Sequence, residues 1–314
     1  MTTRNAVTSS RELVLEALRE GERFVLTTHE HPDGDALGSL AAMQGVMCAL
    51  GKDAFSFLSA DEFPLPYEYR FLELPQLVTS VPDDVGERTV VFLDCGNIDH
   101  HHDNTRFGTV DHVVPDASCT AEVIWDLMRG LGVPLTQPIA EALYVGLVTD
   151  TGRFMYENTG ARAHEMAADL IVAGVDVHEI YRRLYEGVPQ GKLELLARGL
   201  SAVERFDGGL LTLSQLTRED YAVTGADESY SEGVVDHLRA LEGTAMAGRV
   251  RELLSATASS RRKVSLRATD DRVDVSAIAR ALGGGGHRRA AGFSTDLEFG
   301  ELVSFLRARL AEQL

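Results

Sequence analysis

His29-Glu-His-Pro-Asp33-Gly-Asp35-Ala-Leu-Gly38-Ser39 joins two segments of different periodicity, and this change of period indicates the class of fold. Residues 24–28 before it are apolar or β-branched and predict a buried strand. Residues 36–50 after it are small and apolar and predict a helix. The imidazole and carboxylate groups therefore lie at the carboxyl end of a strand, where open α/β sheets hold their ligands.

Three more groups of the same chemistry follow in the first half of the chain. Residues 89–93 predict a second buried strand, and Asp94 comes directly after it. The run Asp99-His-His-His-Asp-Asn104 is next, and Asp150 lies in Thr149-Asp-Thr-Gly152 after a predicted helix at 137–148. Carboxylates mixed with imidazoles suit Mn²⁺ and related divalent ions. Two such ions about 3.5–4 Å apart can clamp the attacking and leaving oxygens of a phosphoryl displacement.

The pattern of elements changes along the chain. The first two-thirds alternates strands and helices, which is typical of a parallel sheet with helices on both faces. From about residue 208 the predicted order is strand, helix, two strands, helix, a glycine run and a last helix, which indicates a smaller α+β domain. We therefore predict a catalytic domain at 1–188, a helical linker at 189–207 and a second domain at 208–314.

Charge separates the two predicted domains. The 314-residue chain has a formal net charge of −18, which argues against a partner such as long duplex nucleic acid. Residues 249–289 nevertheless hold ten basic and four acidic residues, a local receptor for anions. The run Gly283–Gly286 inside this segment can present backbone N–H groups to a phosphate as an anion nest. An isolated glycine run is more often only a flexible turn.

The four N-terminal motifs, in this order, resemble those of the DHH phosphoesterase superfamily. The stretch Gly283-Gly-Gly-Gly-His287-Arg-Arg-Ala-Ala-Gly292 resembles the signature of the DHHA1 domain. Together the motifs cover nearly the whole chain. A single glycine-rich motif would be weak, whereas all five in order are specific.

The resemblance implies roles for individual residues. His29, Asp33 and Asp94 would hold one metal ion, and Asp35, Asp94, His100 and Asp150 the other. Asp94, His101 and Asp99 would form the catalytic group, with His101 facing the phosphate and Asp99 orienting the histidines. The residues expected to bind substrate lie in the basic segment. They are Arg251, Ser265, Arg267, Gly284, Gly285, Gly286 and His287.

One departure from the family concerns the segment between Asp94 and Asp99, which has only four residues. Neighbouring parallel strands are normally linked by a crossover of about a dozen residues or more. Either a segment is absent from the chain or this region is rearranged. The role of His100 depends on which of these holds.

The resemblance implies an enzyme of the nanoRNase/pAp-phosphatase branch. Such an enzyme would use two Mn²⁺ ions, with Mg²⁺ or Co²⁺ as substitutes, to degrade very short RNA or DNA oligonucleotides or to dephosphorylate 3′-phosphoadenosine 5′-phosphate (pAp). A cyclic-dinucleotide phosphodiesterase is the alternative within this class. The non-enzyme alternative is a nucleotide sensor whose second metal site is impaired.

Compartment and assembly are less constrained by the sequence. We expect a cytoplasmic protein, because three scattered cysteines do not make a disulfide framework and no secretory signal is evident. No membrane span is expected, since no run of 18 or more apolar residues occurs. A homodimer is compatible with the sequence.

Overall fold

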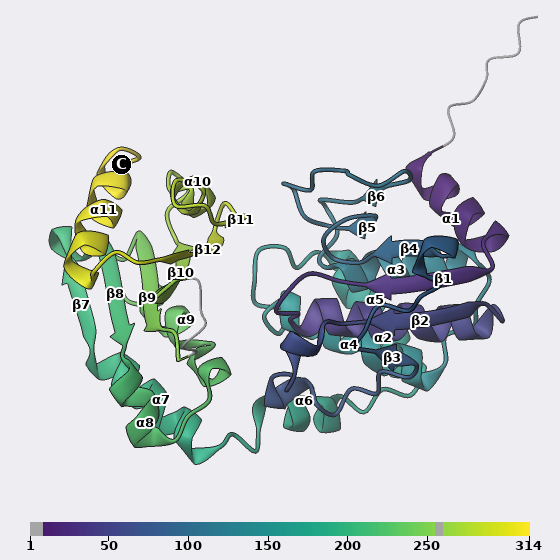
Figure 1. The fold of residues 1–314 in the computed structure, drawn as a ribbon, viewed down its shortest axis with the longest axis horizontal. Helices are drawn as coiled ribbons and strands as arrows, with labels where there is room; N and C mark the ends of the chain where they lie inside the picture. The colour runs from purple at the N-terminus through teal and green to yellow at the C-terminus, as the bar shows by residue number, and fades with distance from the viewer. Residues whose placement is uncertain (1–8, 255–259) are drawn as a thin grey trace, which may run out of the picture. The chain divides into compact units, whose positions relative to one another are not determined.

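The structure is a computed structural model that describes residues 9–254 and 260–314, apart from the side chain of His287. Its contacts divide the chain into two compact units, Met1–Gly187 and Val188–Leu314. Figure 1 shows the first unit in purple to teal and the second in green to yellow. None of the helices in the described ranges is both long enough and apolar enough to cross a membrane.

The first unit is built on a parallel sheet. Strands β1 (Arg23–Thr27), β2 (Asp53–Phe57), β3 (Leu77–Val78) and β4 (Thr89–Phe92) pair in parallel in the order β3-β2-β1-β4. Phe24, Val25 and Leu26 of β1 are all buried. Because successive side chains of a strand point to opposite faces, both faces of the central strand are covered, as the sequence pattern predicts.

Six helices surround this sheet. They are α1 (Ser10–Glu20), α2 (Gly34–Ala49), α3 (Thr120–Gly130), α4 (Gln137–Asp150), α5 (Ala161–Val172) and α6 (Val177–Tyr185). Helices α2 and α4 cross very closely at Gly38 and Gly146. A Cβ atom at Gly38 would lie 2.5 Å from the carbonyl oxygen of Ala142, and one at Gly146 would lie 2.7 Å from Oδ1 of Asp35. Only glycine permits this approach.

A tight loop connects Asp94 to Asp99. Asp94 adopts a left-handed backbone conformation with φ of 61°, and its N–H donates to the carbonyl of Ile98 at 2.9 Å. Leu93 and Ile98 form a single parallel bridge, after which β5 (Ile98–Asp99) pairs in parallel with β6 (His112–Val113). Of the two alternatives for this segment, the arrangement agrees with a rearranged region. Because β5 belongs to a separate two-stranded sheet and only one residue pair bridges it to the end of β4, four residues suffice to connect them.

The second unit is a mixed α+β structure with a six-stranded sheet of order β11-β12-β10-β9-β8-β7. The strands are β7 (Val203–Phe206), β8 (Leu211–Leu216), β9 (Met246–Glu252), β10 (Arg262–Ala268), β11 (Gly285–His287) and β12 (Ala290–Thr295). Its helices are α7 (Gln190–Ser201), α8 (Arg218–Thr224), α9 (Val234–Arg239), α10 (Val275–Arg280) and α11 (Phe299–Ala311). The pair β8 and β9 is parallel, and the others are antiparallel.

Each face of this second sheet has its own core. On one face Val264 and Leu266 of β10 cluster with Ile278 of α10 and Leu306 of α11. On the other face Ala247 of β9 clusters with residues of α9. Residues of β9 and β10 that are not in the first core therefore share the face that α9 covers only in part.

Two segments differ from the sequence-based expectation. Residues 189–207, expected as a linker, contribute α7 and the edge strand β7 to the second unit. The glycine run, expected as an open loop, places Gly285 and Gly286 in β11, where they pair with Gly292 and Ala291 of β12. Strands of two or three residues carry too little periodicity to be recognised in a sequence.

Candidate functional site

Asp35 lies in the first turn of α2 and caps the N-terminus of a different helix. Its side chain is 2% exposed and accepts hydrogen bonds from the backbone N–H groups of Thr120, at 2.6 Å, and Ala121, at 3.0 Å. Both N–H groups belong to the first turn of α3, where the helix dipole favours negative charge. The Ser39 hydroxyl donates to the same carboxylate at 3.3 Å. Asp35 is therefore rigidly held while one side of its carboxylate faces the site.

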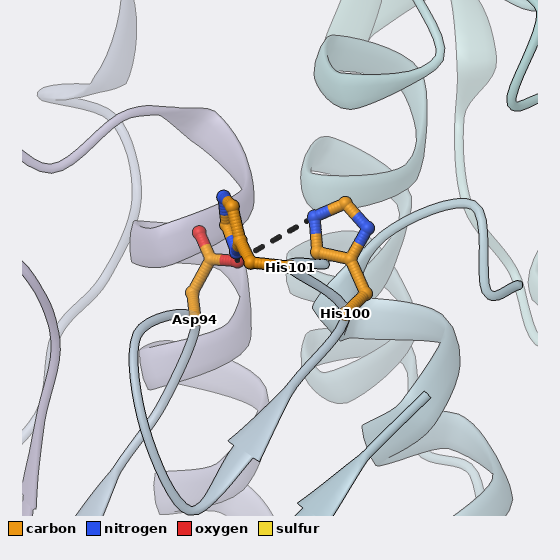
Figure 2. Close-up of side chains that lie close together, drawn as sticks. All are labelled: Asp94, His100 and His101. Atoms are coloured by element: carbon orange, nitrogen blue, oxygen red, sulfur yellow. Dashed lines mark ion pairs between the residues drawn. The ribbon is translucent and has the colours of Figure 1, made fainter. Parts of the chain in front are cut away.

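Asp94 lies beside Asp35 at the end of β4. It is 3% exposed, and its Oδ1 accepts a hydrogen bond of 2.8 Å from the hydroxyl of Thr120. The same carboxylate has histidines on two sides: Nε2 of His29 lies 3.5 Å from Oδ2, and Nε2 of His100 lies 3.8 Å from Oδ1. Figure 2 shows Asp94 turned toward His100 and His101. Asp94 is thus central to the cluster.

His29 and Asp33 approach Asp94 from the loop between β1 and α2. The Nδ1 of His29 is 2.8 Å from the carbonyl of Glu30, so that its Nε2 is left facing Asp94. Asp33 is the N-cap of α2, and its Oδ1 accepts from the N–H groups of Asp35 and Ala36. This cap leaves the other carboxylate oxygen free of hydrogen bonds within the described residues.

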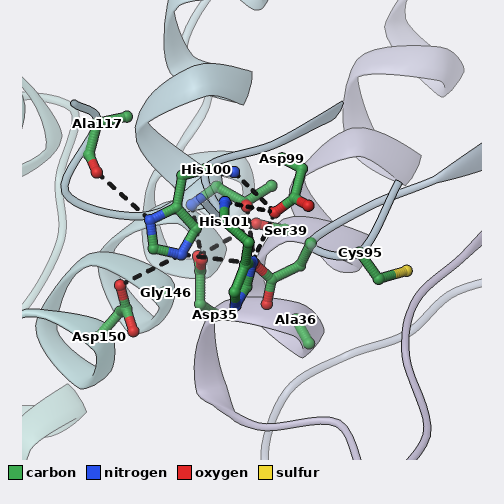
Figure 3. Close-up of polar contacts among 12 residues, drawn as sticks. Asp35, Ala36, Ser39, Cys95, Asp99, His100, His101, Ala117, Gly146 and Asp150 are labelled. Carbon is green, nitrogen blue, oxygen red and sulfur yellow. Dashed lines mark hydrogen bonds and ion pairs between the residues drawn. The ribbon is translucent and has the colours of Figure 1, made fainter. Parts of the chain in front are cut away.

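His100 and Asp150 complete the opposite side of the site (Figure 3). Nδ1 of His100 is 3.3 Å from the carbonyl oxygen of Ala117, and its Nε2 is 3.6 Å from Oδ2 of Asp150. Asp150 ends α4, and the side-chain amide of Asn158 donates to its Oδ2 at 3.3 Å. Burial lowers the pKa of His100 from its ordinary value, which keeps the ring neutral and able to act as a ligand.

Asp99 and His101 form a separate, tightly bonded pair. Asp99 is 1% exposed, and its Oδ1 is 2.6 Å from Nδ1 of His101. Burial opposes its ionisation, but the hydrogen bond from His101 and the charge of that ring lower the pKa of Asp99 to about 2. Burial likewise opposes protonation of His101, yet Asp99 and then Asp94 raise the pKa of His101 to about 9. The pair therefore fixes the ring and keeps it protonated at neutral pH.

The six residues expected as metal ligands lie in two groups that touch each other. The ligand atoms within each group lie within 4.8 Å of one another, and the two groups are His29, Asp33 and Asp94, and Asp35, His100 and Asp150. Asp94 with His100 and His101 makes a third such group, so Asp94 and His100 lie where the groups overlap.

The donor chemistry fits divalent cations. Burial raises the pKa of Asp35, Asp94 and Asp150, and for Asp94 and Asp150 the charges of Asp35 and Asp33 raise it further. Carboxylates crowded in this way need positive charge from outside the chain. Carboxylate oxygens and neutral imidazoles are the ligands that Mn²⁺ and similar ions accept. The donor set of this site therefore fits divalent metal ions.

Several supporting residues were not foreseen from the sequence. Thr120 holds both Asp35 and Asp94, and Asn158 holds Asp150. Glu62 accepts a hydrogen bond of 2.9 Å from the backbone N–H of His31, which has a left-handed φ of 55°. His31 is itself exposed, and its backbone N–H ties the loop that carries the first two ligands to Glu62.

The expected substrate-side residues lie in the second unit, on β9, β10 and the glycine run. Arg251 pairs with Glu228, and the Ser265 hydroxyl accepts a hydrogen bond of 2.6 Å from Arg249. Arg267 is partly buried and donates to the carbonyl of Leu266. Ser265 is paired with Arg249 of β9, and Arg251 lies two residues after Arg249 on the same strand. Because side chains alternate along a strand, Arg251 and Ser265 face the same side of the sheet.

The glycines of the run have structural reasons of their own. A Cβ at Gly284 would lie 2.2 Å from the carbonyl oxygen of Gly292, and Gly286 has a φ of 127°. The close approach to β12 and the positive φ both require glycine. The backbone of His287 lies in β11, but its side chain is outside the described residues, and its expected role stays a prediction.

The comparisons with known proteins agree with this fold. The model of the DHH family, N-terminal domain, matches residues 23–147, and that of the DHHA1 domain matches residues 221–312. The bifunctional oligoribonuclease and PAP phosphatase NrnA of Thermus thermophilus is 36% identical over 293 residues, which cover 89% of this chain and 86% of that protein.

Two solved structures share the fold. An exopolyphosphatase-related protein from Bacteroides fragilis aligns with a TM-score of 0.84 at 21% identity, covering 99% of this chain and 98% of that one. RecJ from Thermus thermophilus in complex with Mg²⁺ aligns with a TM-score of 0.51 at 17% identity, covering 97% and 51%. An α/β unit with a carboxylate–histidine metal centre, followed by an α+β unit, is thus the class of structure. The chain belongs to the DHH family, which confirms the resemblance drawn from its motifs.

Proposed function

We propose that this protein is a phosphohydrolase dependent on divalent metal ions, best served by two Mn²⁺ ions, that acts on very short oligoribonucleotides and on pAp. The observation that carries the proposal is the overlap of the ligand groups at Asp94, with His101 held beside them by Asp99. The similarity over nearly its full length to the oligoribonuclease and PAP phosphatase of Thermus thermophilus supports the choice of substrates.

The proposed chemistry is hydrolysis of a phosphate ester. A water oxygen forms a bond to phosphorus, the bond to the leaving oxygen breaks, and that oxygen takes up a proton. Metal ions at this site would supply Lewis acidity and lower the pKa of bound water. Asp94, with the ligand groups on either side of it, would fix two ions close to each other.

His101 is the residue that we assign to the proton. Its Nδ1 is bonded to Asp99, and we assign to its Nε2 the role of donor to a phosphate oxygen or to the leaving oxygen. The pKa of about 9 keeps this proton in place at neutral pH. Asp99 fixes the tautomer and the ring orientation, as an orienting carboxylate does for a catalytic histidine.

The geometry also bears on the nucleotide-sensor alternative, which required an impaired second metal site. His100 points Nε2 toward Asp150 despite the short loop between Asp94 and Asp99. The group Asp35, His100 and Asp150 is therefore assembled in this chain, and that observation favours an enzyme.

One panel of substrates with Mn²⁺ tests the proposal. We expect turnover of pAp and of a 5′-phosphorylated diribonucleotide, with rates that fall as the oligomer lengthens, and no turnover after chelation of the metal. Cyclic di-AMP, pyrophosphate and a long RNA complete the panel. Preference for the long RNA, or for the cyclic dinucleotide, would assign a different substrate, and no hydrolysis of any compound would refute an enzyme.

A further inference from the structure

One face of the second sheet carries four cationic side chains. In register, Lys263 lies opposite Arg251, Ser265 opposite Arg249, and Arg267 opposite Ala247, so these side chains share a face. We call this set the guanidinium face; its members are Arg249, Arg251, Lys263, Ser265 and Arg267. Burial lowers the pKa of Lys263, and repulsion from Arg251 adds to that effect.

Each arginine of the guanidinium face already has a carboxylate. Arg251 Nη1 pairs with Glu228, Arg249 Nη1 is 3.4 Å from Oε1 of Glu232, and Arg267 Nε is 3.7 Å from Oδ1 of Asp236. The three acids are spaced by four residues, from the short 3₁₀ helix Glu228–Ser231 into α9 (Val234–Arg239). We call Glu228, Glu232 and Asp236 the acidic ladder. They lie outside the basic segment 249–289, and these three acids offset half of its net charge, which is ten basic minus four acidic residues.

The two sides of these ion pairs differ in exposure, most of all in the pair of Arg249 and Glu232. Arg249 is 2% exposed and is held by hydrogen bonds of 2.6 Å to the hydroxyls of Ser231 and Ser265. The side chain of Arg251 is 11% exposed, whereas that of Glu232 is 61% exposed. The guanidinium groups are therefore fixed in the sheet, and the Glu232 carboxylate reaches them from solvent.

The buried guanidinium groups also keep unused donors. The Nε atoms of Arg249 and Arg251 are buried and have no hydrogen-bond partner in the part of the chain that the structure describes. A buried cation with an unmet donor is costly unless another acceptor arrives. A phosphate group, with three acceptor oxygens, meets that need better than one exposed carboxylate.

We propose that the acidic ladder is a set of resident counterions that a phosphorylated ligand must displace, so that the ladder lowers the affinity of the guanidinium face for phosphate groups. This inference rests on the proposed function. Each phosphate that binds has to break an ion pair already in place, and the loss of that pair offsets part of the free energy of binding.

Binding to the metal-free protein tests the ladder apart from catalysis. The affinities of AMP and pAp would be measured by calorimetry in EDTA for the wild type, Glu232→Gln and Glu228→Gln. We expect each variant to bind both AMP and pAp about three- to tenfold more tightly than the wild type does. Glu312→Gln is the matched control, because Glu312 pairs with Arg309 on α11 and should leave both affinities unchanged.

The opposite results are equally informative. Weaker binding of both nucleotides would show that the carboxylates position the arginines, and unchanged binding would show that they do not compete; either overturns the proposal. Glu232→Gln is the cleaner variant, because Glu228 also accepts a hydrogen bond from the N–H of Leu254. Thermal melting followed by circular dichroism checks that the variants fold.

A second pair of probes separates this inference from the proposed function. If the wild type binds neither AMP nor pAp, the proposed substrate class is wrong, and the same comparison is made with pyrophosphate and orthophosphate. Tighter binding of either inorganic anion to Glu232→Gln would still support the ladder. Absence of binding of both inorganic anions to the wild type would overturn it, since the face would then receive no anion.

Discussion

The metal centre of the first unit and the guanidinium face of the second both concentrate charge of one sign, but they differ in the counter-charges that surround it. Asp35, Asp94 and Asp150 crowd together, Asp35 and Asp94 are buried, and histidines are the ion-pair partners of Asp94 and Asp150. Each arginine of the guanidinium face instead has a carboxylate partner from the same unit. Charge left without a fixed counter-charge awaits an ion from solution, whereas charge already paired can only exchange partners.

The largest expected effect comes from removing the charge that the ligand groups share. Asp94→Asn should lower kcat/KM by roughly a thousandfold, because a bound ion contributes several kcal/mol to the transition state. The backbone should tolerate asparagine, since Asp94 has a left-handed φ of 61°. The variant should melt at a higher temperature than the wild type when both are free of metal, because a buried, repelled charge is gone.

The control for this variant is Asp169→Asn, which alters an exposed carboxylate on α5 of the same unit. It should change neither activity nor melting temperature. If metal-free Asp94→Asn melts at a lower temperature than the wild type, then Asp94 is stabilising in the empty protein, and the contrast drawn between the two regions fails.

After metal removal, the free energy of unfolding should depend on pH because the crowded carboxylates repel one another. Burial raises the folded-state pKa of Asp35, Asp94 and Asp150. The folded protein then binds more protons than the unfolded chain above about pH 4, so the free energy of unfolding of the metal-free protein falls as pH rises through the raised values. Mn²⁺ at about a hundred times its dissociation constant should restore about 2.7 kcal/mol.

This effect can be followed in the first unit alone. Trp125 on α3 is the single tryptophan of the chain, and its fluorescence reports on the helix whose N-terminus Asp35 caps. We expect Mn²⁺ to raise the melting temperature by roughly 5–10 °C, and by more at pH 8 than at pH 5. A larger effect of the metal at pH 5 would contradict the expected direction.

A smaller effect should follow from weakening the hydrogen bond between Asp99 and His101. Asp99→Asn removes the charge that raises the pKa of His101 to about 9, so the pKa of His101 should fall, and kcat should drop by about ten- to a hundredfold. NMR titration of the histidine ring protons in the metal-free protein measures the pKa. Asp103→Asn, an exposed change in the same loop, is the control. An unaltered His101 pKa would remove Asp99 from its assigned role.

The smallest expected effect concerns the guanidinium face. Arg267→Ala should raise KM for pAp by about tenfold through the loss of a charge-assisted hydrogen bond, and it should leave Mn²⁺ affinity unchanged. Arg272→Ala is the control, because Arg272 is exposed and pairs with Asp270. Loss of Mn²⁺ binding in Arg267→Ala would mean that the two regions do not divide their tasks as described.

Much of the first unit could be predicted from the sequence because its signals are local. The motif after β1 and Asp94 after β4 each combine a strand pattern with polar residues at the strand end, and parallel strands bring such ends together. The supporting residues could not be predicted in this way. Thr120 reaches Asp35 across 85 positions, so its role exists only once α3 has docked.

The second unit was harder to predict for a different reason. Its basic segment was visible as composition, but the carboxylates that pair with it come from residues 228–236, outside that segment. The glycine run was expected as a loop, although Gly285 and Gly286 lie in β11. A three-residue edge strand has no periodicity of its own and forms only because β12 is available to pair with it.

The glycine contact between α2 and α4 has a consequence for the distance between the two metal-ligand groups. Asp35 starts from one of these helices and Asp150 ends the other, and the backbones meet at Gly38 and Gly146 without side chains between them. The close crossing therefore fixes the distance between the two helices. One methyl group at either glycine would increase this distance and move the two carboxylates apart, so two residues without functional groups set the spacing of the ligands.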